Sequence, residues 1–150
     1  ITTVFMDNMA IAAAFAVLFI IIAINILFDL LGTAILSAEE APFHSLSARR
    51  VKGAKETISI IRHAPQLANV CCDVIGDIAG IISGAATATI VAELTATFGI
   101  VSIFPGLLLT GAVGAMTIGG KATCKGIGLK NGNSIVFALG KIAAVFNRKH

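Results

Sequence analysis

Carboxylate and amide side chains interrupt the apolar runs of this chain at a few positions where they could hold a cation. Asn25 and Asp29 lie in the first long apolar run, and Asp73 and Asp77 lie near the start of the second. Ionisable residues are costly inside a membrane and often mark ion pathways, and hard cations such as Mg²⁺ prefer oxygen ligands. Cation binding is therefore the first chemistry to consider.

The spacing of these polar residues is helical. One stripe holds Asn25, Asp29, Gly32 or Thr33, Leu36 and Glu40. A second stripe holds Asp73, Asp77, Gly80 and Gly84. If the two stripes face each other, they line a polar path or pocket. The alternative is that Asp73 and Asp77 lie at the boundary of the second span, within reach of water and Lys121.

Composition indicates that lipid is the solvent around these helices. Of the 150 residues, 57% are hydrophobic and 13% are charged, and mean hydropathy is +0.95, whereas soluble domains have about 25% charged residues. All 11 Lys and Arg lie at 49–62 and 121–149, as expected for cytoplasmic flanks of membrane helices. There is no Tyr or Trp to stack bases, which argues against nucleic-acid binding.

We therefore expect an all-α, polytopic membrane helical bundle that forms a single domain over 1–150. The predicted transmembrane helices are 9–36, 69–98 and 100–120, each long enough to cross a ~30 Å hydrocarbon core. An amphipathic juxtamembrane helix is predicted at 47–62, a loop or broken helix at 121–132 and a C-terminal helix at 133–147. The expected location is the cell membrane, multi-pass, with the N-terminus outside and the C-terminus cytoplasmic.

Local signals predict where the helices begin and turn. Ser37 and Glu40 have the spacing of a capping box, so a new helix should start near 37–42, where Pro42 is tolerated. A short turn near Gly99 should make the second and third spans a tight hairpin. Small residues four apart predict close helix packing, within the bundle or across a homodimer. They are Gly76, Gly80, Gly84, Gly111, Ala115 and Gly119.

The segment 37–47, Ser-Ala-Glu-Glu-Ala-Pro-Phe-His-Ser-Leu-Ser, followed by a basic helix, resembles the membrane domain of the cyclin M (CNNM), CorB and CorC magnesium transporters. That family has a Ser-Gly-Ser-Glu-Thr-Ala-type motif after its first helix, and Ser37 and Glu40 match its Ser and Glu. Its Gly-Glu-x-x-Pro-Lys motif after the third helix is similar to residues 120–125. There Gly120 and Lys125 match, while Lys121 replaces the Glu and Cys124 the Pro.

The resemblance implies magnesium transport, a dimer and a cation site built from oxygen ligands. The implied cation-facing groups are Ser37, Glu40, Asp73, Asp77, Asp29 and Asn25, with Glu40, Asp73 and Asp77 as metal ligands. Lys121 stands where the family has an acidic ligand, and an ammonium repels Mg²⁺. Four alternatives remain open: Lys121 points away, the site binds something else, ion binding is lost, or the ammonium replaces the cation by pairing with Asp73, Asp77 or Glu40.

Two functions follow from these residues. The first is divalent-cation transport, with Mg²⁺ as the possible ligand and no other cofactor expected. The second is a non-transporting paralogue that acts as a structural or regulatory membrane subunit. No nucleophile stands with a base in the pattern of an enzyme, and the three cysteines fit no metal spacing, so catalysis is not expected.

Overall fold

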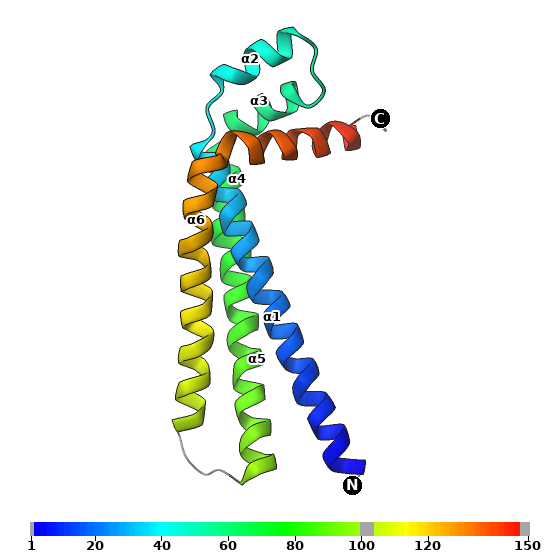
Figure 1. Cartoon of the computed structure of the whole chain (residues 1–150), viewed down its shortest axis with the longest axis vertical. Coiled ribbons are helices and arrows are strands. Elements are labelled where there is room, and N and C mark those ends of the chain that lie inside the picture. Colours follow the sequence, from blue (N-terminus) through cyan, green and yellow to red (C-terminus); the bar gives the residue numbers. More distant parts are fainter. Residues whose placement is uncertain (1, 100–103, 148–150) are drawn as a thin grey trace.

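The structure, a computed structural model, describes residues 2–99 and 104–147. These residues fold into helices joined by short connections, with no strand among them. Three long helices stand side by side: α1 (Thr2–Ser37), α5 (Ile75–Phe98) and the first part of α6 (Phe104–Asn147) (Figure 1). Short α4 (Ala64–Asn69) and the π-helical segment η1 (Val70–Val74) run directly into α5.

Three helices are long and apolar enough to cross a membrane: Ile11–Ser37, Ala64–Thr97 and Phe104–Phe146. The three predicted apolar helices are therefore confirmed in number and order. Many of their large side chains point outward, among them Phe19, Ile81, Leu108 and Ile118, which are 49–74% exposed. Outward apolar side chains are what a bilayer environment requires, because lipid tails are as apolar as leucine.

The interior of the bundle is held by a few side chains on α1 and its neighbours. Leu18 and Ile22 of α1 pack with Ile90 of α5 in the middle of the bundle. A second cluster joins Ala34 and Ile35 of α1 to α4 and to the far part of α6. Since α1 contacts both α5 and α6, it is the central element that positions residues of the other two.

Beyond the bundle, α2 (Ala41–Ala48), α3 (Ala54–Arg62) and the last part of α6 form a layer across one end (Figure 1). We call this layer the platform, and residues 132–147 of α6 the arm. The arm turns away from the bundle at Asn131, whose φ of −117° and ψ of 21° are not helical. The predicted C-terminal helix at 133–147 is thus confirmed as the arm.

Of the two alternatives for 121–132, the loop is wrong, because α6 remains helical from Phe104 to the kink, and the broken helix agrees with the non-helical residue Asn131. The glycines that suggested a loop serve close packing instead. A Cβ added at Gly128 would lie 3.0 Å from the carbonyl oxygen of Leu30, and one added at Gly132 would lie 2.9 Å from that of Ala34. Contact with α1 therefore outweighs the low helix propensity of these glycines.

The single juxtamembrane helix expected at 47–62 is also wrong. The chain turns between α2 and α3, where Arg50 and Gly53 have φ of 55° and 89°, which a helix cannot contain. The predicted capping box fails as well, since Ser37 is the last residue of α1 and the N-cap of α2 is Glu40, without a side-chain cap. Pro42 does lie in the first turn of α2, as expected.

Among the described residues, Gly76 has neighbours on α1 and α6, but most of the small residues predicted to pack closely make no close contact. Around Gly80, Gly84, Gly111 and Gly119 an added Cβ would meet nothing within 4 Å, so those faces are open. Close approaches occur instead at Gly32, Gly120, Gly128, Gly132 and Gly140. The homodimer predicted from these residues stays a prediction.

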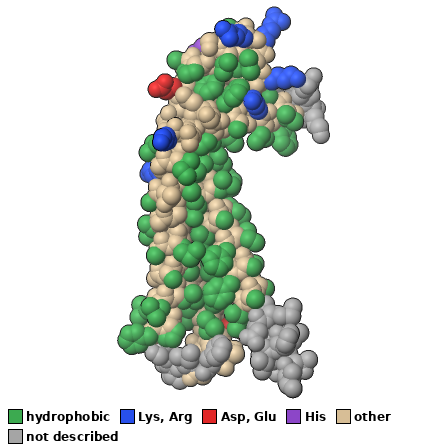
Figure 2. Space-filling model, in the orientation of Figure 1, with side chains coloured by type: hydrophobic (Ala, Val, Ile, Leu, Met, Phe, Trp, Pro, Cys, Tyr) green, Lys and Arg blue, Asp and Glu red, His purple; other side chains and the backbone are tan. Residues whose placement is uncertain are grey.

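The Lys and Arg side chains that the structure describes, from both basic blocks, lie toward the platform end of the molecule. Figure 2 shows Lys and Arg side chains gathered over the platform and the adjoining end of the bundle, while the rest of the visible flank shows apolar and uncharged surface without Lys or Arg. This segregation is consistent with the predicted topology, in which both blocks are cytoplasmic.

Candidate functional site

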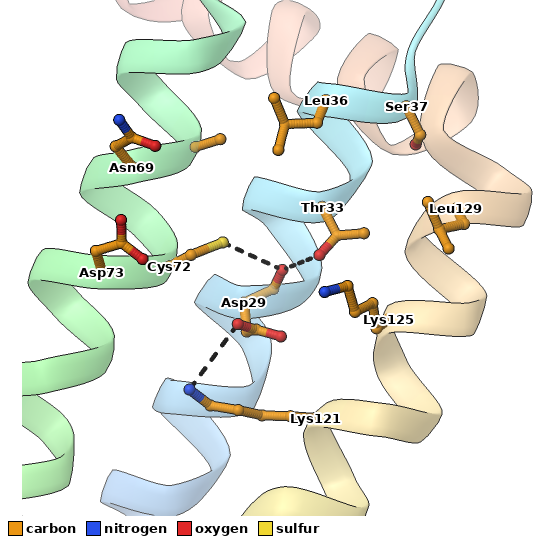
Figure 3. A pocket seen from close by; sticks show the side chains of 11 residues that line it. Asp29, Thr33, Leu36, Ser37, Asn69, Cys72, Asp73, Lys121, Lys125 and Leu129 are labelled. Carbon is orange, nitrogen blue, oxygen red and sulfur yellow. Dashed lines mark hydrogen bonds and ion pairs between the residues drawn. The ribbon is translucent and has the colours of Figure 1, made fainter.

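A cleft of about 540 Å³ opens between α1, the α4–η1 segment and α6, at the platform end of the bundle. Its polar lining includes residues from all three elements, as Figure 3 shows. They are Asp29, Thr33 and Ser37 of α1, Asn69, Cys72 and Asp73 of α4–η1, and Lys121 and Lys125 of α6. Asp29 lies eight residues before the end of α1, about 12 Å along the helix axis.

The central contact of the cleft is an ion pair between α1 and α6. Lys121 Nζ lies 3.9 Å from Asp29 Oδ1, and the two side chains are 29% and 17% exposed. Figure 3 shows the Lys121 side chain reaching from α6 toward the Asp29 carboxylate. One of the four alternatives for Lys121 was pairing with Asp73, Asp77 or Glu40; among the described residues the ammonium pairs with a carboxylate, but that carboxylate is Asp29 and none of those three.

The formal charges of the cleft balance. Asp29 and Asp73 supply two carboxylates, and Lys121 and Lys125 supply two ammonium groups. A site that binds a free divalent cation needs an excess of negative charge or of neutral oxygen ligands. The balance therefore favours internal ion pairing over capture of an ion from solution.

Asn25 lies deeper in the bundle, one helical turn before Asp29. Its side chain is 4% exposed, and its Oδ1 is buried without a hydrogen-bond partner among the described residues. A Cβ added at Gly76 would lie 3.7 Å from this oxygen and 3.6 Å from Lys121 Nζ. The amide oxygen and the ammonium therefore both lie close to the backbone of Gly76, which has no side chain to keep them away.

Two hydroxyl groups and one thiol near the ion pair donate hydrogen bonds to backbone carbonyls. Thr33 donates to the carbonyl of Asp29 at 2.8 Å, and the thiol of Cys72 donates to the same carbonyl at 3.8 Å. Ser37 donates to the carbonyls of Ala34 and Gly128 at 3.1 and 3.2 Å. These contacts tie α1 to η1 and α6, so the two helices that carry Asp29 and Lys121 are fixed relative to each other.

The segment that carries Asp73 is a single π-helical turn, Val70–Val74. Such turns insert an extra residue into a helix and occur frequently at functional sites. Cys72 and Asp73 of this turn line the cleft together with Asn69 at the end of α4, while Asp77 in the first turn of α5 is exposed and does not line it. The proposal of two stripes facing each other therefore holds for Asp73 and not for Asp77.

Glu40 lies outside the cleft, on the platform. Its Oε1 accepts a hydrogen bond from Arg62 Nε at 2.8 Å and lies 3.0 Å from His44 Nε2. The hydrogen bond from Arg62, with the charges of Arg62 and His44, lowers the pKa of Glu40 below its usual value of 4.5 despite partial desolvation. The carboxylate that the resemblance assigns to the cation thus joins α2 to α3.

This pKa shift predicts a small, acid-sensitive contribution of Glu40 to stability. A lowered pKa in the folded state stabilises the fold above the unfolded value near 4.5, and the contribution disappears as pH falls through the folded pKa. Replacing Glu40 with Gln should lower the melting temperature slightly at pH 7, and this loss should shrink progressively as pH falls below 4.5, measured by thermal unfolding in detergent. Glu39→Gln, an exposed neighbour, is the matched control, and a loss that stays the same at every pH contradicts the assignment.

The proposed metal ligands Glu40, Asp73 and Asp77 are not brought together. In the described part of the chain, no group of three or more His, Cys, Asp or Glu side chains could share a metal ion. The cleft contains Thr33, which the sequence named only as the alternative to Gly32 in the first polar stripe, and it adds Asn69 and Cys72, which were not among the sequence candidates. The helical spacing from Asp29 was the signal that indicated Thr33.

Comparison with known proteins adds no relative. No family model matches the chain, and neither a curated protein nor a solved structure matches it.

Proposed function

We propose that the chain is a multi-pass membrane protein of the CNNM/CorC type in which Lys121 occupies the position of a transported cation. In this proposal the bundle acts as a non-transporting structural or regulatory membrane subunit, with the platform on the cytoplasmic side. The resemblance at Ser37–Ser47 and at Gly120–Lys125 supports the family assignment, and the three apolar helices support residence in a membrane.

The observation that carries the proposal is the ion pair between Lys121 and Asp29 in the cleft. Two unit charges about 4 Å apart attract each other by about 4 kcal/mol at an effective dielectric constant of ~20, and an ammonium repels a divalent cation at that distance by about twice as much. A Mg²⁺ ion entering the cleft would have to displace Lys121 from Asp29. The tethered ammonium thus holds the bundle together where a free ion would otherwise be needed.

Divalent-cation transport is the second candidate, and two observations favour it. The buried Asn25 Oδ1 lacks a partner among the described residues, so it is free to accept a ligand. Asp73 lines the cleft without an ion-pair partner among those residues. If the Lys121 side chain moves away from Asp29, the side chains of Asn25, Asp29 and Asp73 supply oxygen ligands of the kind that Mg²⁺ prefers.

Magnesium flux into liposomes tests the two candidates against each other. Purified wild type and Lys121→Glu are reconstituted with a Mg²⁺-sensitive dye inside the vesicles, and Lys130→Glu serves as a control on the same helix outside this cleft. We expect no flux above protein-free vesicles for wild type and for the control. We expect Mg²⁺ to raise the melting temperature of Lys121→Glu alone, because only that variant gives the cleft an excess of carboxylates.

The opposite result favours transport. Flux by wild type that disappears in Asp29→Asn and in Asp73→Asn, with both variants folded, contradicts the non-transporting proposal. Glu40→Ala is the matched negative control for that outcome, since Glu40 lies on the platform and pairs with Arg62.

A further inference from the structure

A second cleft, of about 920 Å³, lies in the platform, away from Asp29 and Lys121. We call it the basic pocket. It is bounded by the turn between α2 and α3, by the start of α3 and by the arm. The proposed function uses none of its residues.

The basic pocket is strongly cationic. Arg50, Lys52, Lys55 and Lys141 line it, against the single carboxylate of Glu56. Within the described residues, none of these four cations has a carboxylate within ion-pair distance. Lys141 instead holds its ammonium 4.4 Å from the centre of the Phe137 ring, which keeps the charge at a fixed position. Four cations gathered in one concavity repel each other and favour an anionic ligand.

The walls of the pocket are fixed by close backbone packing. A Cβ added at Gly53 would lie 2.8 Å from the backbone nitrogen of Lys141, and one added at Gly140 would lie 2.7 Å from the carbonyl oxygen of Gly53. The turn therefore rests directly on the arm. At its edge Arg50 has a φ of 55°, a left-handed conformation that non-glycine residues rarely adopt. The turn thus carries a strained cation at the mouth of the pocket, as functional sites often do.

One side of the pocket is apolar. Val51, Ala144 and Val145 line it together with the cations. Next to them on the arm, Ile142 and Phe146 are 57% and 75% exposed. In Figure 2, apolar side chains lie along the lower face of the arm, and basic side chains lie above them. An anionic group with an apolar tail would satisfy both surfaces.

We propose that the basic pocket binds the phosphate headgroup of an anionic phospholipid, with the acyl chains lying along the arm and the adjoining bundle. Basic pockets at the cytoplasmic ends of membrane helices bind such headgroups, and the volume is in the range of small-molecule sites. The lipid is favoured over a free anion because the apolar wall continues onto the exposed face of the arm.

Native mass spectrometry of the full chain in nonionic detergent tests the proposal. The probes are phosphatidylglycerol and phosphatidylcholine with identical acyl chains, and inorganic phosphate as a competitor. We expect phosphatidylglycerol to bind at least tenfold more tightly than phosphatidylcholine. The triple variant Lys52→Gln, Lys55→Gln, Lys141→Gln should lose that preference, and Arg49→Gln, Lys125→Gln, Lys130→Gln, which removes the same charge outside the pocket, should keep it.

Three results overturn the proposal. The first is equal binding of the two lipids, and the second is equal loss of binding in the two triple variants. The third is displacement of phosphatidylglycerol by inorganic phosphate at similar concentration, because that result would identify the ligand as free phosphate. Thermal unfolding of both triple variants verifies that they are folded. The single variant Lys55→Gln, whose side chain is exposed, should weaken lipid binding severalfold and provides the test if the triple variant fails to fold. An unchanged affinity in that variant also contradicts the proposal.

Discussion

Replacing Gly140 with alanine should destabilise the protein by about 1–3 kcal/mol, the usual cost of forcing extra atoms into a packed core. The new Cβ would collide with Thr57 Oγ1 and would lie 2.7 Å from the carbonyl oxygen of Gly53. Neither neighbour can move easily, because Thr57 is fully buried and its hydroxyl donates to that same carbonyl at 2.7 Å. At roughly 2–4 °C per kcal/mol for a chain of this size, the melting temperature should fall by several degrees.

The control is the same substitution at a glycine with open surroundings. An alanine Cβ at Gly111 would meet nothing within 4 Å, and alanine is a better helix former than glycine by about 1 kcal/mol. Gly111→Ala should therefore leave the melting temperature unchanged or raise it. A lower melting temperature for Gly140→Ala together with no loss for Gly111→Ala, measured by thermal unfolding in detergent, supports the observed contact between α3 and the arm. A loss of similar size at Gly111 would place that face in a contact with another helix, as the predicted homodimer requires.

The apolar runs were sufficient to predict three membrane-length helices, because the length and hydropathy of an apolar run are properties of the sequence alone. The break between α2 and α3 was not predictable, since Val51, Ala54 and Ile58 keep helical spacing through a turn that contains Arg50 and Gly53 at positive φ. The same limitation applies to α6. A glycine-rich basic stretch is typical of a loop, and only contact with α1 explains why it stays helical.

The sequence predicted several residues of the candidate site but not the ion pair between Asp29 and Lys121. Asp29, Asp73, Ser37 and Lys121 do meet in one cleft. Glu40 was misplaced because the assumed helical stripe runs past Ser37, whereas α1 ends there and the chain turns into α2. Asp77 was misplaced because the π-helical turn changes the phase between Asp73 and α5, which a fixed 3.6-residue period cannot anticipate.

Removing the Lys121 ammonium should be costly for a reason that does not depend on transport. Lys121→Met would leave the Asp29 carboxylate, 17% exposed, without its ion-pair partner. Breaking a fully buried pair costs about 3–5 kcal/mol, and the partial exposure of both groups lowers the expected loss to about 2 kcal/mol. Lys125→Met is the matched control, because Lys125 lines the same cleft and has no ion-pair partner among the described residues.

The double variant Asp29→Asn, Lys121→Met separates the ion pair from the packing of the lysine stem. Because neither charge is left alone in the double variant, its stability should exceed that of Lys121→Met, with a coupling energy of about 1–2 kcal/mol in the thermodynamic cycle. The measurement is unfolding in detergent for the four proteins. Additive losses would mean that the 3.9 Å contact contributes nothing. The Asp29 carboxylate would then be available to a mobile cation. That result would favour cation transport over the proposal that Lys121 acts as a tethered cation.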